Sequence, residues 1–161
     1  MNKTPIQFIL NGSETGVFAD SGANLLDVLR REAGDLTPKQ GCAQGGCGAC
    51  SVIIDGALHL ACLTLAETAN GKRVETAAGL ADGPNLHPLQ KAFVEGFAAQ
   101  CGFCSTGMLM AAGALLRSNP NPTRDQVAEA IAGNLCRCTG YEPIINAILT
   151  AAAELRGGAA G

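Results

Sequence analysis

The chain has 161 residues, and its 11 Lys and Arg against 14 Asp and Glu give a formal net charge of −3. This length suffices for one compact domain or two small ones. No basic run or basic-aromatic patch stands out, so nothing supports nucleic-acid binding. No apolar run reaches the roughly 18 residues of a membrane span, and the first residues lack the pattern of a secretory signal peptide. We therefore expect a cytoplasmic protein.

Two features of the composition are unusual. Charged residues make up 16% of the chain, below the typical ~25%, and 21 residues are glycine. Because the centres of protein interfaces are depleted in charge, the low charge predicts that partner chains cover much of the surface. The glycines predict many tight turns or close backbone approaches.

The first half of the chain has the patterns of strands around one helix. Residues 24–32 place apolar side chains on one face, and Gly34 ends the predicted helix. The dipeptides Asn11-Gly12 and Asp55-Gly56 each predict a hairpin turn. We expect strands over residues 5–10, 16–19, 51–54, 57–60 and 72–76. This order predicts a small mixed sheet crossed by one helix, the β-grasp arrangement.

Beyond a joint at residues 78–84, which carries glycine and proline, the pattern is helical throughout. Apolar residues recur at helical spacing, and Thr123 with Gln126 forms a capping-box pattern. We expect helices over residues 88–99, 105–117, 123–132 and 143–155, and a frayed tail over 157–161. The predicted fold class is α+β, with a β-grasp domain over residues 1–80 and an all-α four-helix-bundle domain over residues 81–161.

Eight cysteines fall into two sets of four, and the first set has a diagnostic spacing. Cys42, Cys47 and Cys50 follow the pattern Cys-x4-Cys-x2-Cys, and Cys62 comes after eleven more residues. This is the spacing of plant-type [2Fe–2S] ferredoxins rather than of paired zinc knuckles. The intervening residues are almost all small, which lets backbone N–H groups approach the sulfurs. A disulfide framework is disfavoured, because the cytosol is reducing.

The second set is Cys101 and Cys104, followed after 31 residues by Cys136 and Cys138. Taken alone, this spacing also suits a structural zinc ion, although a one-residue gap is uncommon in zinc knuckles. Each pair lies at the predicted N-terminal end of a helix, where the helix dipole favours negative charge. Because the second and fourth helices of an antiparallel bundle start at the same end, we expect the two pairs to meet.

The remaining residues give no sign of catalysis. His59 lies on a predicted strand and His87 precedes a proline, and neither has a nucleophile beside it. The glycine-rich loop does not match a phosphate-binding motif, because Ser51 and Cys47 stand where glycine and lysine are required. We therefore expect no catalytic residue, and the chemistry open to this chain alone is redox chemistry at metal centres.

Three motifs together resemble a known family. They are Gly-Cys-x2-Gly-x-Cys-Gly-Ala-Cys over residues 41–50, Gln-Cys-Gly-Phe-Cys over 100–104 and Gly-Asn-Leu-Cys-Arg-Cys-Thr-Gly-Tyr over 133–141. In this order they are similar to the small iron–sulfur subunit of the molybdenum hydroxylases. That family includes xanthine dehydrogenase, aldehyde oxidoreductases, carbon monoxide dehydrogenase and 4-hydroxybenzoyl-CoA reductase. The resemblance covers nearly the whole chain.

The resemblance implies a ferredoxin-like domain and a four-helix domain, each with one [2Fe–2S] cluster. The implied ligands are Cys42, Cys47, Cys50 and Cys62 for the cluster nearer a flavin, and Cys101, Cys104, Cys136 and Cys138 for the cluster nearer the molybdenum cofactor. Gln100 would hydrogen-bond the pterin of that cofactor. The family usually has Thr-Pro after the cysteine matched by Cys104. This chain has Ser105-Thr106 there, and we expect Ser105 to cap the following helix.

The function implied by the resemblance is electron transfer in a heteromeric molybdenum-dependent oxidoreductase. The chain would relay electrons between a large molybdenum-pterin subunit and FAD in a medium subunit, or another redox acceptor. A dimer of heterotrimers is compatible with this family. One alternative is a free-standing two-cluster ferredoxin, which the small net charge disfavours because transient electrostatic docking favours strong charge. Another is a zinc-stabilised scaffold, which would be colourless and rich in zinc when purified.

Overall fold

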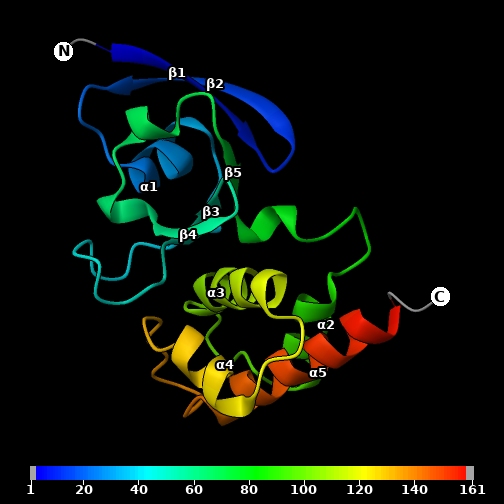
Figure 1. Cartoon of the computed structure of the whole chain (residues 1–161). Coiled ribbons are helices and arrows are strands. Elements are labelled where there is room, and N and C mark those ends of the chain that lie inside the picture. The colour runs from blue at the N-terminus through cyan, green and yellow to red at the C-terminus, as the bar shows by residue number, and fades with distance from the viewer. Residues whose placement is uncertain (1–2, 159–161) are drawn as a thin grey trace.

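The computed structural model describes residues 3–158, and its first half is a five-stranded mixed sheet (Figure 1). The strand order is β2–β1–β5–β3–β4. β1 pairs antiparallel with β2 and parallel with β5, and β3 pairs antiparallel with both β5 and β4. The strands are β1 (Lys3–Leu10), β2 (Ser13–Asp20), β3 (Ser51–Ile54), β4 (Ala57–Leu60) and β5 (Arg73–Glu75). The predicted mixed sheet is therefore confirmed.

Both predicted hairpin turns are present. Asn11 and Gly12 have φ angles of 50° and 85°, and Asp55 and Gly56 have φ angles of 48° and 86°. Two consecutive residues with positive φ form the turn whose twist matches that of a two-stranded ribbon. The turn residues therefore fix the register of β1 against β2 and of β3 against β4.

The helix that crosses the sheet is less regular than the helix predicted over residues 24–32. α1 (Leu25–Asp27) begins after Asn24, whose side chain accepts a hydrogen bond from the Asp27 amide at 2.9 Å. It continues as a π-helical turn over Val28–Glu32, which the Ala33 amide closes on the carbonyl five residues before it. The wider turn keeps the apolar side chains of the segment against the sheet, and those at 25, 26, 28 and 29 are buried.

The second half contains α2 (Pro88–Glu95), α3 (Ser105–Ser118), α4 (Arg124–Ala130) and α5 (Glu142–Gly158). α2 ends before the predicted residue 99, because the backbone turns left-handed at Phe97, where φ is 51°. α5 is longer than predicted, so the expected frayed tail is wrong for residues 157–158, and 159–161 lie outside the described residues. Among the helices of residues 3–158, none is both long and apolar enough to cross a membrane.

Two hydrophobic cores share strand β3. Val52 and Ile54 belong to the core between the sheet and α1, together with Leu29. Ile53 belongs to the other core, among the helices, together with Met108 of α3. Successive residues of a strand point to opposite faces, so β3 is buried on both sides. Full burial of such a side chain contributes roughly 1.5–3 kcal/mol, so Ile53 fixes the helical half to the sheet.

The two halves also meet backbone to backbone, between α3 and the loop that precedes β3. A Cβ at Gly107 of α3 would collide with the carbonyl oxygen of Gly48. The buried Asn134 side chain donates to the same carbonyl at 2.9 Å. Arg117 of α3 also donates to the Glu75 carboxylate of β5 at 2.9 Å. In Figure 1, α3 accordingly lies directly against the sheet, with the other helices beyond it.

We predict that Gly107→Ala destabilises the folded protein by about 1–3 kcal/mol, because the added methyl group overpacks against the Gly48 carbonyl. Gly113→Ala on the same helix is the matched control. Its Cβ would meet only the Leu89 side chain, at 4.0 Å, and alanine favours a helix over glycine by about 1 kcal/mol. Thermal unfolding followed by circular dichroism should give a lower midpoint for Gly107→Ala only. Equal midpoints for the two variants would contradict the close contact.

Candidate metal centres

All eight cysteines are free thiols, and they lie as four pairs of neighbouring thiols. The pairs are Cys42 with Cys47, Cys50 with Cys62, Cys101 with Cys138, and Cys104 with Cys136. Within residues 3–158, no group of three or more His, Cys, Asp or Glu side chains is arranged to hold one metal ion. Pairs of thiols are what a [2Fe–2S] cluster requires, since each of its two irons takes two protein ligands.

The loop that carries the first three cysteines curls around the sulfur of Cys42. The amide of Gly46 lies 3.3 Å from that sulfur. The Gln44 amide, followed by the Cys47 thiol, lowers the pKa of Cys42 to about 7, below the usual value for a cysteine. N–H groups directed at sulfur stabilise its negative charge. The loop therefore suits a thiolate ligand.

Steric room around one sulfur and the burial of two thiols also suit a metal centre. A Cβ at Gly41 would lie 2.8 Å from the sulfur of Cys47, so only glycine keeps that sulfur clear. Burial raises the pKa of Cys50 to about 11, and burial followed by the Cys136 contact raises that of Cys104 to about 12. Thiols bind metals as thiolates, so a positive iron at these sites would offset the cost of burying their charge.

The second cysteine set comes from two places far apart in the sequence. Cys104 directly precedes the first residue of α3, and Cys101 lies three residues before Cys104. Cys136 and Cys138 lie in the loop between α4 and α5. The sulfurs of Cys101 and Cys138 are 3.6 Å apart. Cys101 and Cys104 therefore meet Cys136 and Cys138, as the sequence predicts.

The prediction that Ser105 caps α3 is wrong. Ser105 is already the first residue of the helix, and Cys104 takes the capping position without a side-chain hydrogen bond. A cap must lie one residue outside the helix for its side chain to reach back to the first free amides. Among the described residues, the hydroxyl oxygens of Ser105 and Thr106 are buried without a hydrogen-bond partner.

Two residues without a sequence-predicted role support Cys136. The phenol oxygen of Tyr141 accepts a hydrogen bond from the Cys136 amide at 3.0 Å. The Thr139 hydroxyl lies 3.1 Å from the Cys136 sulfur, and its oxygen accepts a hydrogen bond from the Tyr141 amide at 3.2 Å. Both residues belong to the motif over 133–141, but its spacing alone does not say which side chains face the sulfur.

Gln100 lies beside the second cysteine set. Its side chain is exposed, and its Nε2 donates to the Cys138 carbonyl at 3.1 Å. An amide held through its NH2 group keeps its oxygen as an acceptor for another molecule.

The two histidines lie elsewhere. His59 is exposed on β4, and His87 caps α2 by accepting a hydrogen bond from the Leu89 amide at 3.2 Å. Burial lowers the pKa of His87, which keeps its ring neutral and able to accept. His87 thus has a structural role.

A backbone hydrogen bond joins the loops that carry the two cysteine sets. The Leu135 amide donates to the Cys47 carbonyl at 2.9 Å, and Leu135 directly precedes Cys136. The neighbouring Asn134 binds the Gly48 carbonyl and also the Ser51 hydroxyl, the latter at 3.3 Å. Cys47 of the first set therefore accepts this hydrogen bond, and Cys136 of the second set directly follows the residue that donates it.

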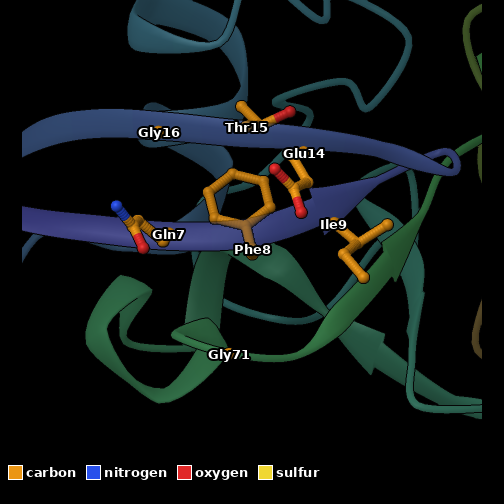
Figure 2. Close-up of a pocket in the computed structure, with 7 residues that line it drawn as sticks. All are labelled: Gln7, Phe8, Ile9, Glu14, Thr15, Gly16 and Gly71. Atoms are coloured by element: carbon orange, nitrogen blue, oxygen red, sulfur yellow. The ribbon is translucent and has the colours of Figure 1, made fainter.

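A separate surface pocket lies on the hairpin of β1 and β2 (Figure 2). Seven residues line it, of which Glu14 is the one ionisable residue. Figure 2 shows Gln7, Phe8 and Ile9 on β1 and Glu14 and Thr15 on the neighbouring strand β2. The pocket thus involves a different part of the sheet from the cysteine loop.

Comparison with known proteins covers both halves. Residues 17–95 match a family model described as a 2Fe-2S iron-sulfur cluster binding domain, and residues 76–149 match one described as a [2Fe-2S] binding domain. Over 154 residues the chain is 44% identical to the nicotine 6-hydroxylase small subunit of Paenarthrobacter nicotinovorans. That match covers 96% of this chain and 93% of the relative.

A solved structure and a longer protein are also similar to this chain. The fold matches a chain of quinoline 2-oxidoreductase from Pseudomonas putida 86 with a TM-score of 0.94 and 44% identity, over 98% of this chain and 99% of that chain. The aldehyde oxidoreductase of Megalodesulfovibrio gigas is 46% identical over 92% of this chain, which spans 17% of that longer protein. Similarity of this extent means that the chain belongs to the family of small iron–sulfur subunits of the molybdenum hydroxylases.

Proposed function

We propose that this chain relays electrons between a molybdenum-pterin subunit and an acceptor in a heteromeric oxidoreductase. The observation that carries the proposal is the grouping of eight thiols into four pairs, in two sets joined through Leu135 and Cys47. An electron relay needs two redox centres close together, each with its own ligands. The nearly full-length similarity to a hydroxylase small subunit supports the same role.

We propose one [2Fe–2S] cluster for each cysteine set and one set for each domain, with the domains over residues 1–80 and 81–161. Cys42 with Cys47 and Cys50 with Cys62 would hold the two irons of the first cluster, and Cys101 with Cys138 and Cys104 with Cys136 those of the second. The pairing of neighbouring thiols supports this division. When bound, such a cluster takes up and releases one electron at a time. The protein supplies thiolates and N–H donors, and it excludes water around Cys50.

We propose that α2–α5 form a four-helix bundle that holds the second cysteine set at one end. Contacts of α5 with α2 and α4, and of α3 with both α2 and α4, support this arrangement. Three exposed apolar side chains lie close to the second set in the sequence, namely Val94, Phe97 and Phe103, which are 66%, 82% and 47% exposed. Exposed large apolar side chains favour coverage by a partner chain. We propose the large molybdenum-pterin subunit as that partner.

The first cysteine set has its own exposed apolar neighbours, Leu63 and Leu65, which are 63% and 52% exposed beside Cys62. We propose that an FAD-containing medium subunit, or another redox acceptor, binds there. The substrate would bind to the large subunit, and two heterotrimers would form a dimer. Localisation in the cytoplasm is part of the same proposal, because eight free thiols persist in a reducing compartment.

Cysteine substitutions test the two-cluster assignment. We expect two distinct [2Fe–2S] signals in low-temperature electron paramagnetic resonance of the dithionite-reduced complex. Cys104→Ser should remove the second-set signal, and Cys50→Ser is the matched variant that should remove the other. Iron analysis should show a loss of about half the iron in each case, because each cluster holds two irons. Loss of the same signal in both variants would contradict the assignment, and a complex rich in zinc would contradict the electron-transfer function.

Gln100 tests the proposed contact with the pterin. We predict that Gln100→Ala slows electron transfer out of the molybdenum centre about five- to tenfold, because one hydrogen bond of about 1 kcal/mol is lost. Both cluster signals should remain. Rapid-freeze electron paramagnetic resonance of the assembled complex measures this rate, and Gln40→Ala, an exposed glutamine before the first set, is the control. A rate equal to that of the control would contradict the proposed contact of Gln100 with the pterin.

A further inference from the structure

The structure and the chemistry of iron ligands together show which atom donates the hydrogen bond between Thr139 and Cys136. The hydroxyl oxygen of Thr139 lies 3.1 Å from the Cys136 sulfur, where either atom could be the donor in a free thiol. A cysteine that ligates iron has lost its proton, so its sulfur can only accept. The Thr139 hydroxyl must therefore donate to the sulfur when iron is bound.

A second hydrogen bond holds the hydroxyl in the donating orientation. The Tyr141 amide donates to Thr139 Oγ1 at 3.2 Å, which occupies the acceptor side of the hydroxyl. The Tyr141 phenol oxygen in turn accepts from the Cys136 amide at 3.0 Å. Three hydrogen bonds thus form a closed loop through Cys136, Thr139 and Tyr141, and the hydroxyl proton is directed at the sulfur.

Because of this geometry, we propose that the Thr139 hydroxyl sets the reduction potential of the second [2Fe–2S] cluster by donating a hydrogen bond to the Cys136 sulfur. The inference rests on the proposed ligand set, and Thr139 acts as a positioning residue through that ligand. Reduction adds negative charge that is shared by the sulfurs. A donor to a ligand sulfur stabilises this charge and so raises the potential of the cluster.

A further observation agrees with this role. Within residues 3–158, Cys136 is the cysteine whose sulfur contacts a side-chain hydroxyl, whereas Cys42 receives a backbone amide. The two cluster sites therefore differ in a donor that one substitution can remove.

The test is a redox titration of the complete complex, with each cluster followed by its own electron paramagnetic resonance signal. In Thr139→Val, which keeps the shape and removes the hydroxyl, the ratio of reduced to oxidised second cluster at a fixed potential should fall about tenfold. For a one-electron couple this corresponds to a midpoint lower by about 59 mV. The first-cluster signal should titrate as before. Thr139→Ser retains the hydroxyl and should restore the original midpoint.

Thr150→Val is the matched control, because the Thr150 hydroxyl donates to the Asn146 carbonyl on the exposed face of α5 at 3.0 Å. It should move neither midpoint. An unchanged second-cluster midpoint in Thr139→Val, with both signals intact, would overturn the tuning role and leave the two-cluster assignment standing. Absence of a second [2Fe–2S] signal in the unaltered complex would instead overturn the proposed function.

If Thr139→Val loses the second cluster, Thr139→Ala is measured as well, because alanine places no branched side chain in the loop. If Thr139→Ala retains the cluster, a lower midpoint of that cluster supports the tuning role and an unchanged midpoint overturns it. If both variants lose the cluster and Thr139→Ser keeps it, the hydroxyl is needed for assembly, and the tuning role is rejected.

Discussion

The hydrogen bond from the Leu135 amide to the Cys47 carbonyl is the contact on which the arrangement of the two cysteine sets depends. It ties the loop before β3 to the loop between α4 and α5, 88 positions further along the chain, and it is protected by Asn134, which is 3% exposed. Two glycines allow this contact, because a Cβ at Gly107 would collide with the Gly48 carbonyl and a Cβ at Gly48 would collide with Gly133 and Asn134. Packing between the halves therefore determines how close the proposed redox centres lie.

Around the sulfurs, the protein supplies polar groups in different ways at the two sites. The loop around Cys42 uses backbone amides, which small residues allow to come close. At Cys136 the side-chain hydroxyl of Thr139 faces the sulfur, and the phenol oxygen of Tyr141 accepts a hydrogen bond from the Cys136 amide. Donors of either kind favour charge on sulfur. The second arrangement can be varied by single substitutions, whereas the first is built into the backbone.

The low content of charged residues is accompanied by exposed apolar side chains in the structure. Exposed apolar side chains stand close in sequence to both cysteine sets, at 94, 97 and 103 for the second set and at 63 and 65 after Cys62 for the first. Apolar surface around a redox centre keeps water away when a partner covers it. The same residues thus support both the proposed subunit contacts and the proposed environment of the clusters.

The sequence by itself determined the order of the elements, the two hairpin turns and the two cysteine sets, because these depend on local propensity and on spacing along the chain. It did not determine the π-helical turn after α1, the early end of α2 at Glu95 or the position of Ser105 inside α3, since one residue of backbone geometry decides each of them. Only the tertiary structure decided which thiols pair, that Ile53 joins the helical core and that Thr139 and Tyr141 close around Cys136. These are contacts between side chains distant in sequence or between neighbours in a loop. Periodicity carries no information about either kind of contact.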